Sequence, residues 1–396
     1  MKYIDLFAGM GGFHEAITRV FPDAECVATA EIKKTAIQTL DHNYGLENIN
    51  FKGDIYKMDE KELPDFDILF AGFPCQPFSE AGKRQGFTDT RGTLFFEIER
   101  ILKEKKPKHL ILENVQGLVT HDRGNTLRVI LKHLEDLGYQ VSWDVLNSAE
   151  FGVAQIRKRI YIVGSLNKQI SLDDFPISHR VFKDIKEEGI PVEETEFTKR
   201  LLSKVEPSEL EGKRIRDQRC GKKSLHSWNL ELKGPISEED KQFLTDWIHN
   251  RRRVTYKVSK GTESVMFTRN ELATFYTGED LNKSLADLLE KEYIQIRPNG
   301  YYDLKCGQMS FPYTMFIDKN EPTNTLTATD LSHVGVVEET GVRKLTTREC
   351  LRLSGYDENY TFPDNLSQRQ IYDLIGNTVC VSVVEAIIRR IFRQNV

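Results

Sequence analysis

The sequence predicts an α/β fold whose main part is a doubly wound, mostly parallel β-sheet. Over the first 165 residues, short apolar runs alternate with segments of helical periodicity, as in strands joined by crossover helices. Three acidic residues, Asp5, Glu31 and Glu113, fall at or near the ends of apolar runs. Because ligands bind beyond the carboxyl ends of the strands in such sheets, these acids indicate a binding site.

The composition sets limits on the class of protein. The 396 residues predict two domains, and 39% hydrophobic with 29% charged residues predicts a globular chain. A net charge of -5 excludes a histone-like cation but permits a local basic cleft. No run approaches the roughly 20 apolar residues of a membrane helix, and no signal peptide is evident, so we expect a cytoplasmic protein. The six cysteines form no C-x-x-C pair or zinc-type cluster, so free thiols and no metal are expected.

The elements of the first domain follow in order along the chain. Buried strands are predicted at 2–7, 25–30, 67–71, 109–113 and 159–164, with a further strand that ends near Asp54. Helices are predicted at 13–20, after Glu31, and from about 93 to 105. Two apolar helical segments near the end of the chain, 371–375 and 379–392, bracket Gly376 and Asn377.

The middle of the chain has a different character. An acidic stretch at 173–196 precedes a basic one at 213–223 and the run Arg251, Arg252, Arg253. Bases interleaved with Trp228, Trp247 and Tyr256 suit a surface for nucleic-acid phosphates, although a solvated face gives the same pattern. Residues 268–305 combine two helical segments with a β-ribbon around a turn at 297–300. They resemble a winged-helix unit, and an ordinary helical hairpin with a surface loop fits equally.

A glycine turn and two acids form the first group of candidate site residues. Gly9, Gly11 and Gly12 follow the first strand in a G-x-G-G spacing, which differs from the G-x-G-x-x-G of dinucleotide binders. Glu31 could hold both hydroxyls of a ribose, and Asp54 could accept from an adenine amino group. This layout is typical of a site for an adenosyl ligand, but a structural turn with surface acids would look similar.

A cysteine between two prolines forms the second group. Cys75 follows a strand in Gly-Phe-Pro-Cys-Gln-Pro-Phe-Ser, and a glycine-rich loop with several bases comes next. A lone cysteine is most often a small buried residue, but the cationic loop favours a catalytic thiol. Further along, Glu113 could be a buried carboxyl with a raised pKa. Arg157 and Arg159, at alternate positions, could share one face of a strand and hold phosphate or a base carbonyl.

These motifs together resemble DNA (cytosine-5) methyltransferases of the bacterial restriction–modification type. The resemblance rests on DLFAGMGGF, GFPCQPFS, RGTLFFE, ENVQGL, QIRKRIYIVG, RKLTTRECLRLSGY and GNTVCVSVVEAI, in the family's order. It implies a Rossmann-like, S-adenosylmethionine-dependent methyltransferase domain at 1–175 and 341–396, completed by the C-terminal helix. An inserted target-recognition domain at 176–340 would end with the Thr-Leu pair that begins at Thr325.

The resemblance also implies a reaction. Cys75 would add to C6 of a cytosine flipped out of duplex DNA, and C5 would take the methyl group of S-adenosylmethionine. Glu113 would protonate or hydrogen-bond N3, Arg159 would bind O2, and Asn114 would help position the site, with Arg157 counted among the catalytic residues. The base that removes the C5 proton is not identified, and water is a candidate.

The same resemblance implies the binding residues and the partners. The methyl donor would contact Phe7, Gly9, Gly11, Glu31, Asp54, Ile55, Pro74 and Asn377. DNA contacts are expected at Gln76, Ser79, Arg91 and Thr325, and the clustering of bases, rather than the resemblance, adds phosphate contacts at Arg251, Arg252 and Arg253. The protein would be a monomer without a metal, and it would protect DNA against an endonuclease of the same specificity.

Two other functions remain open from the sequence. An RNA cytosine-5 methyltransferase acting on transfer RNA would share the catalytic motifs, although the basic middle segment favours DNA. A non-catalytic DNA-binding regulator with a degenerate methyltransferase fold is disfavoured by the intact Cys75, Glu113 and Arg159. An oxidoreductase of Rossmann type is less favoured still, because its phosphate fingerprint is missing.

Overall fold

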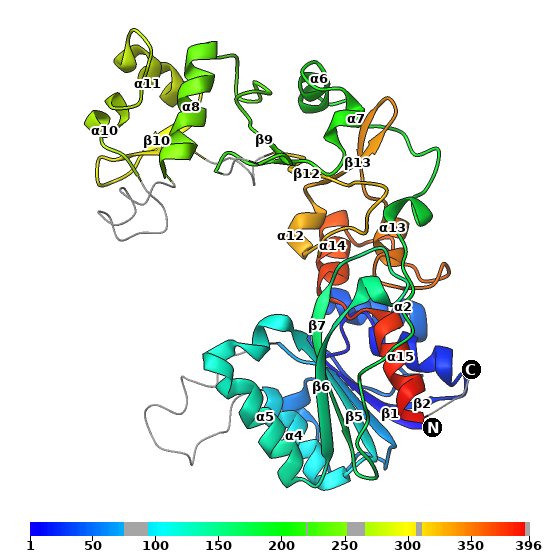
Figure 1. Ribbon diagram of the computed structural model, residues 1–396. Helices are drawn as coiled ribbons and strands as arrows, with labels where there is room; N and C mark the ends of the chain where they lie inside the picture. The colour runs from blue at the N-terminus through cyan, green and yellow to red at the C-terminus, as the bar shows by residue number, and fades with distance from the viewer. Residues whose placement is uncertain (75–93, 219–220, 252–265, 306–310, 393–396) are drawn as a thin grey trace. The chain divides into compact units, whose positions relative to one another are not determined.

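The chain folds into two compact units. The computed structural model describes residues 1–74, 94–218, 221–251, 266–305 and 311–392. Unit 1 comprises Met1–Glu187, Asn320–Leu331 and Thr346–Val396, and unit 2 comprises Glu188–Lys319 and Ser332–Leu345. The predicted α/β fold class is confirmed, since unit 1 is built on a seven-stranded sheet with helices on both faces (Figure 1).

The sheet of unit 1 is parallel except at one side. In sheet order its strands are β3 (Phe51–Gly53), β2 (Glu25–Ala30), β1 (Lys2–Leu6), β4 (Ile68–Gly72), β5 (His109–Val115), β7 (Lys158–Ser165) and β6 (Gln140–Asn147). The first five run parallel, β7 is antiparallel to β5, and β6 is antiparallel to β7. The carboxyl ends of β1, β2, β4 and β5 therefore meet at one edge.

Side chains that alternate along the strands divide the core of unit 1 into two faces. Ile4 and Leu6 belong to the cluster that also contains α4 (Leu94–Lys105) and α5 (Asn125–Asp136). On the other face, Tyr3 and Phe70 contact each other, and Phe70 stacks on Phe13 of α1 (Gly12–Val20) with ring centroids 5.3 Å apart. Helix α15 (Val381–Phe392) packs against α1, so both ends of the chain build this face.

The remaining helical elements of unit 1 include two longer helices, α2 and α14, and several short ones. They are η1 (Ile55–Lys57), α2 (Lys34–Tyr44), η2 (Gln116–Val119), η3 (His121–Gly124), η4 (Ser148–Glu150), η5 (Phe182–Asp184), α12 (Ala328–Leu331), α13 (Thr347–Arg352) and α14 (Gln368–Asn377). One stretch, Gln368–Phe392, is long and apolar enough to cross a membrane by length and composition, but 72% of its window is buried in the protein. It comprises α14 and α15, and this burial is that of core helices.

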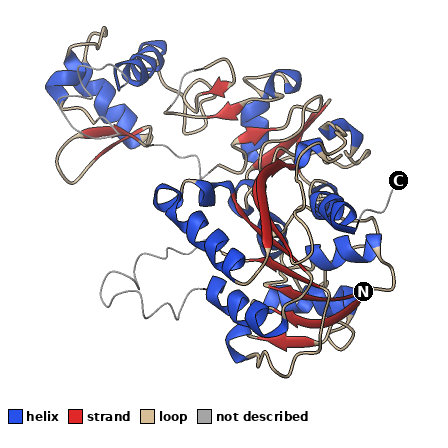
Figure 2. Cartoon of the chain, turned by 60° about the horizontal axis from the view of Figure 1, so that its bottom comes forward, coloured by secondary structure: helices blue, strands red, loops and turns tan. Residues whose placement is uncertain are grey.

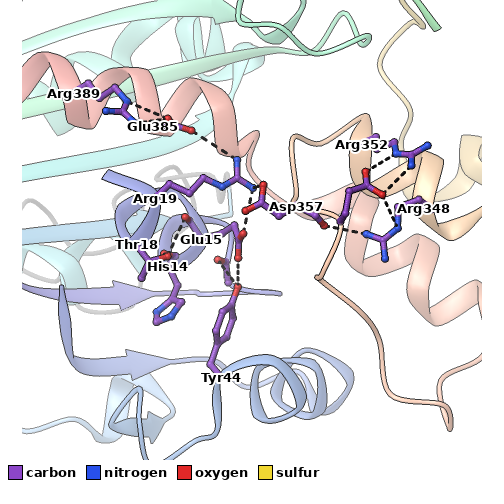
Figure 3. A network of polar contacts seen from close by, with 12 residues as sticks. His14, Glu15, Thr18, Arg19, Tyr44, Arg348, Arg352, Asp357, Glu385 and Arg389 are labelled. Atoms are coloured by element: carbon purple, nitrogen blue, oxygen red, sulfur yellow. Dashed lines mark hydrogen bonds and ion pairs between the residues drawn. The ribbon is translucent and has the colours of Figure 1, made fainter. Parts of the chain in front are cut away.

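A polar network joins α1 to the C-terminal part of the chain (Figure 3). The guanidinium of Arg19 forms ion pairs with Asp357 at 2.8 Å, Glu15 at 3.2 Å and Glu385 at 3.8 Å. The hydroxyl of Tyr360 also donates to the carbonyl of Met10 in the glycine turn, at 2.5 Å. These contacts hold residues of the last fifty positions against the first strand and helix.

Unit 2 contains a five-stranded sheet with its own core. In sheet order the strands are β14 (Gly341–Lys344), β13 (Val334–Glu338), β12 (Met315–Phe316), β8 (Arg214–Ile215) and β9 (Ser224–Leu225). Ile215, Phe316 and Val342 of this sheet form an apolar cluster. Helices α6 (Glu196–Leu202) and α7 (Pro207–Leu210) contribute Leu201 and Leu210 to it.

A second cluster of unit 2 belongs to what we term the helix–hairpin unit, residues 238–251 and 266–305. Its elements are α8 (Glu238–Arg251), α10 (Arg269–Ala273), α11 (Leu281–Glu290), β10 (Ile294–Ile296) and β11 (Tyr302–Leu304) (Figure 2). Phe267 pairs with Tyr302 of β11 through two backbone hydrogen bonds, so an isolated β-bridge extends the hairpin on one side. Helices α10 and α11 and the hairpin of β10 and β11 lie within residues 268–305, where the sequence patterns place them. A winged-helix role for these elements stays a prediction.

The boundaries of the compact units differ from the domain boundaries proposed from the sequence. The sequence division falls at 175/176 and 340/341, whereas unit 1 extends to Glu187 and also includes Asn320–Leu331. The second segment joins unit 1 because the backbone of Thr323 bonds to that of Ala154 and Ile156. Local composition could not reveal this pairing, which links positions about 170 residues apart.

Candidate functional site

A cavity of about 420 Å³ opens at the carboxyl ends of the parallel strands of unit 1. Seven of the eight residues predicted to bind the methyl donor line it: Phe7, Gly9, Glu31, Asp54, Ile55, Pro74 and Asn377. These residues come from four strand ends near the start of the chain and from α14 near its end. The topology therefore gathers side chains that the sequence separates by as many as 370 positions.

The glycine turn forms one wall of this cavity. Gly9 has a φ of 57°, and a Cβ there would meet no atom within 4 Å, so the space above it is open. Its backbone N–H donates to Glu31 Oε2 at 2.8 Å. Gly11 lies elsewhere: a Cβ on it would stand 2.6 Å from the Tyr44 ring, at a φ of 85°. Gly11 therefore allows close packing against α2, and it does not line the cavity.

Two carboxylates face the cavity from adjacent strands. Glu31 is held by its bond to Gly9 and by the backbone N–H groups of Ile32 and Lys33, at 2.7 and 2.8 Å. Asp54 accepts from the backbone N–H of Tyr56 at 3.0 Å. Glu31 Oε1 accepts two of these bonds, but Glu31 Oε2 keeps one lone pair and Asp54 Oδ2 accepts none of these bonds. The two acids can therefore accept hydrogen bonds from hydroxyl or amino groups of a ligand.

Large apolar side chains at the cavity are the residues that sequence reasoning missed. Ile32 is 73% exposed and Tyr56 is 52% exposed, and both line the cavity with Leu374. Exposed apolar groups beside an acid can cover a flat aromatic ligand. Ile32 follows the predicted acid Glu31 by one position, and Tyr56 follows Asp54 by two. The sequence does not show that these two side chains face solvent.

The predicted nucleophile, Cys75, lies outside the described residues, and so do Gln76, Ser79 and Arg91. The structure does show what precedes Cys75. The side chain of Asn114, which is buried, donates from Nδ2 to the carbonyl of Phe73 at 2.8 Å. Its Oδ1 accepts from the backbone N–H of Val115. Asn114 thus ties the chain leaving β4 to the end of β5.

Glu113 lies at the end of β5, in the strand next to the one that leads to Cys75. Burial raises the pKa of its carboxyl, while the charges of Arg159 and Arg157 oppose that rise. Arg159 Nε stands 3.2 Å from Glu113 Oε1, and both side chains are at least 85% buried. The antiparallel pairing of Val115 with Arg159 brings the two together. The predicted acid and one predicted arginine are therefore in contact.

Arg157 has different partners from Arg159. Its Nη2 donates to the carbonyls of Gly376 and Thr378, at 3.1 and 2.8 Å. Burial, followed by the charge of Arg159, lowers its pKa to about 10. Arg157 thus holds the segment around Asn377 in place, and this observed contact is with the protein backbone.

Thr325 lies in unit 1, where its hydroxyl donates to the carbonyl of Ile156 at 2.7 Å. The side chain of Gln155 donates to the carbonyl of Leu353 and accepts from the backbone N–H of Leu326. The segment that contains Thr325 therefore packs against the residues that lead into β7. A DNA contact by Thr325 stays a prediction.

The predicted arginine run at 251–253 is only partly described. Arg252 and Arg253 lie outside the described residues. The side chain of Arg251 is 10% exposed, and its Nη2 stands 3.4 Å from Asp303 Oδ1. Asp303 in turn pairs with Arg297 at 2.7 Å. The guanidinium of Arg251 is thus committed to a buried partner, whereas a phosphate contact would require it at the surface.

The described residues contain neither a candidate metal site nor a disulfide. Within the described ranges, no group of three or more His, Cys, Asp or Glu side chains converges as a metal site would require. Three described cysteines, Cys26, Cys350 and Cys380, are buried, and they form no disulfide.

Comparisons with known proteins agree with this geometry. The family model described as C-5 cytosine-specific DNA methylase matches residues 1–393. The type II methyltransferase M.NlaIV of Neisseria lactamica is 44% identical over 421 residues, covering 99% of this chain and 98% of the relative. The type II methyltransferase M.BanI of Aneurinibacillus aneurinilyticus is 41% identical over 427 residues, covering 100% and 96%.

Solved structures show the same fold at low sequence identity. A putative DNA modification methyltransferase encoded within an E. coli prophage has a TM-score of 0.55 and 18% identity, covering 99% of both chains. A DNMT2 variant of Spodoptera frugiperda has a TM-score of 0.52 and 18% identity, also covering 99% of both chains. At this identity the two structures inform on the fold alone.

Proposed function

The chain belongs to the family of C-5 cytosine-specific DNA methylases, and from this premise we propose how its own residues carry out the reaction. The protein is a DNA (cytosine-5) methyltransferase related to type II restriction–modification enzymes. The observation that supports the proposal most is the buried Glu113–Arg159 pair, which lies at the sheet edge where the cavity of unit 1 opens.

The cavity fits S-adenosylmethionine, which supplies the methyl group when bound. A Cβ would find no atom within 4 Å at either Gly9 or Gly53, so the ligand can approach the backbone at both. Glu31 would accept from the ribose hydroxyls and Asp54 from the adenine amino group. The apolar side chains of Ile32 and Ile55 would cover the adenine ring. Phe7, Pro74 and Asn377 would complete the contacts.

Glu113 would act on the target cytosine as a proton donor. A carboxyl whose pKa is raised by burial holds its proton at higher pH, and it can pass that proton toward N3. Arg159 would donate a hydrogen bond to O2 of the cytosine while keeping Glu113 in position. Arg157 would support both by fixing the backbone near Asn377. The charge that accumulates on the ring would thereby be stabilised.

Cys75 would be the nucleophile, on the strength of its motif. Its sulfur would add to C6, which makes C5 nucleophilic toward the methyl group, and loss of the C5 proton would then release the sulfur. A cytosine stacked in a duplex is out of reach, so the base would have to leave the helix. Asn114 contributes by holding the backbone just before Cys75.

The biological setting follows from the relatives. The substrate would be double-stranded DNA, contacted by Gln76, Ser79, Arg91 and Thr325 and by the middle of the chain. We propose a cytoplasmic monomer that protects DNA from an endonuclease of the same specificity. Transfer of a labelled methyl group to duplex DNA and to transfer RNA, side by side, tests the substrate class. Labelling of transfer RNA alone would reject the proposal.

The Cys75→Ser variant tests the mechanism directly. A hydroxyl is a far weaker nucleophile than a thiolate, so methyl transfer should be abolished while donor binding stays normal. Transfer of label to DNA and calorimetric titration with S-adenosylmethionine measure the two properties separately. Near-normal methylation by the variant would show that another group attacks C6.

A further inference from the structure

Unit 2 carries two groups of basic side chains that differ in how they are neutralised. The helix–hairpin unit has seven described Lys and Arg residues, and five of them form intramolecular ion pairs. Lys291 pairs with Asp287 at 2.7 Å, and Lys305 pairs with Glu292 at 2.6 Å. Residues 266–305 also hold seven acids against five bases. Most cations of this unit already have a carboxylate partner.

The second group lies on what we term the β8–β9 edge, residues 213–218 and 221–225 around the two last strands of the sheet. Besides Arg214, its described cations are Lys213, Arg216, Lys222 and Lys223, and these four are at least partly exposed. Among the residues that the structure describes, none of these four takes part in an ion pair with an acid. The edge therefore presents positive charge to solvent.

Two acids of this region, Asp217 and Glu211, already have partners of their own. Asp217 is buried and accepts from both the backbone N–H and the hydroxyl of Ser227, at 2.8 and 2.7 Å. Burial also raises the pKa of Asp217, which favours its neutral form. Glu211 is paired with Lys319 at 3.0 Å. Neither carboxylate is directed at the four cations.

The strand geometry directs Arg216 away from the apolar cluster. Arg214 pairs in register with Ser224, and Ile215 with Leu225, in two parallel strands. Ile215 is buried in the apolar cluster of the sheet, so Arg216, one position along, starts from the opposite face. In the described part of the sheet β9 has only one neighbour, so the edge is not covered by another strand.

We infer that the β8–β9 edge is the surface of unit 2 that contacts the phosphates of duplex DNA, and that the helix–hairpin unit is not. Unpaired cations gain by neutralising phosphates, because counterions are then released from the DNA. A cation already paired with a carboxylate must first lose that partner. The inference rests on the proposed function, since it assumes a DNA substrate.

Two charge-matched triple variants test the inference. The first is Lys213→Gln with Lys222→Gln and Lys223→Gln; the control is Lys241→Gln with Lys291→Gln and Lys305→Gln, which removes three paired lysines of unit 2. Binding to a methylatable duplex and to an unrelated duplex is titrated at several salt concentrations. The edge variant should bind both duplexes more weakly, and its log–log salt slope should be smaller by about one unit per lost contact. The control should keep the wild-type slope.

The outcomes separate this inference from the proposed function. Equal slopes for the edge variant and the wild type would overturn it, as would equal losses in both triple variants. A changed methylation sequence in the edge variant would also overturn it, because phosphate contacts carry no sequence information. Lys→Arg replacement of the same three residues should restore the slope. If wild-type protein transfers no methyl group to DNA, the proposed function fails instead, and thermal melting shows whether each variant is folded.

Discussion

Burial gives the carboxyl of Glu113 a pKa above its usual range, and this shift is testable as catalysis. Glu113→Gln keeps the shape and a hydrogen bond but removes the proton, so we expect the methyl-transfer rate to fall by roughly 10²–10⁴-fold. Wild-type activity should decline as pH rises through the raised pKa, because the acid form is then lost. Single-turnover rates across a pH series measure both effects. A variant rate equal to wild type at every pH would remove Glu113 from proton transfer.

Asp5 is a second buried carboxyl, at the end of β1 beneath the glycine turn. Burial, together with the charge of Glu31, raises its pKa well above the usual value, and the backbone N–H of His14 opposes the rise. A group with a raised folded-state pKa contributes stability below its unfolded pKa, and that contribution is lost as pH rises. The stability of Asp5→Asn relative to wild type should therefore increase from about pH 4 upward. Chemical unfolding at several pH values measures it, and a constant difference would contradict the shift.

Site residues could be predicted where their position follows from the end of a strand. Phe7, Glu31, Asp54 and Asn377 line one cavity, as a sheet with ligands at its carboxyl edge requires. Gly11 does not line the cavity, and its glycine character serves close packing against Tyr44, so a contact with the methyl donor stays a prediction. A local pattern shows that a residue must be glycine, but it does not show whether ligand or protein fills the space.

At the scale of elements, Arg251 joins the end of α8 to β11. Removing a nearly buried cation leaves Asp303 with one partner, so Arg251→Ala should lower the free energy of unfolding by about 1–3 kcal/mol. Arg297→Ala removes the more exposed partner, 46% exposed, and should cost at most about 1 kcal/mol. Urea unfolding of both variants makes the comparison. Equal losses would mean that the burial of Arg251 does not matter.

That comparison also bears on the arginine run 251–253. If Arg251→Ala destabilises the helix–hairpin unit, weaker DNA binding by a variant of all three arginines would reflect lost structure as well as lost charge. Sequence clustering of bases does not distinguish paired from free cations, because the partner Asp303 lies more than fifty positions away.

A second prediction concerns the ion pair between Lys33, which precedes α2, and Asp373 of α14. Lys33, Leu374 and Asn377 line the cavity of unit 1, and Asp373 precedes Leu374 and accepts from Asn377 Nδ2 at 3.1 Å, so the pair adjoins the cavity. The side chains are 40% and 44% exposed, which limits the pair to about 1 kcal/mol, or roughly a fivefold change in donor affinity. Lys33→Asp should weaken S-adenosylmethionine binding, and adding Asp373→Lys should restore part of it.

The control for this charge swap is Lys132→Asp, which breaks an exposed pair with Asp136 on α5. Calorimetric titration should find its donor affinity unchanged. Additive losses in the swapped double variant, with no recovery, would show that the two charges do not act on each other.

Strand prediction succeeded for the central strands and for the edge strand β3, but it missed β6 at the other edge. The run 25–30 predicts a strand, and β2 is Glu25–Ala30. Central strands are buried on both sides and read as apolar runs. β6 was missed because most of its residues are half-exposed, with Trp143 41% exposed, so its sequence is not an apolar run. Strand order and the antiparallel insertion of β7 depend on pairing between distant segments, which local patterns do not encode.

At the scale of the whole molecule, the feature that the sequence predicts least well is the boundary between the two units. The acidic stretch at 173–196 crosses this boundary: Asp184 caps a short helix within unit 1, whereas the residues from Glu188 onward belong to unit 2. The return of 320–331 to unit 1 depends on backbone pairing with residues 154–156. Composition marks a change of character along a chain, whereas a compact unit is defined by contacts.

The packing of α15 against α1 governs when the enzyme can first work during its own synthesis. All residues of unit 2 leave the ribosome before α15 does, so its core can form while unit 1 still lacks one layer. Until then α1 presents Ala16, Ile17 and Val20, which are buried in the finished fold, to water or to chaperones. At about 5–20 residues per second, the delay from the end of α1 to the end of α15 is on the order of 20–75 s. A chain released before α15 is made therefore lacks the helix that packs against α1. The apolar side chains of α1 are then exposed and prone to aggregation.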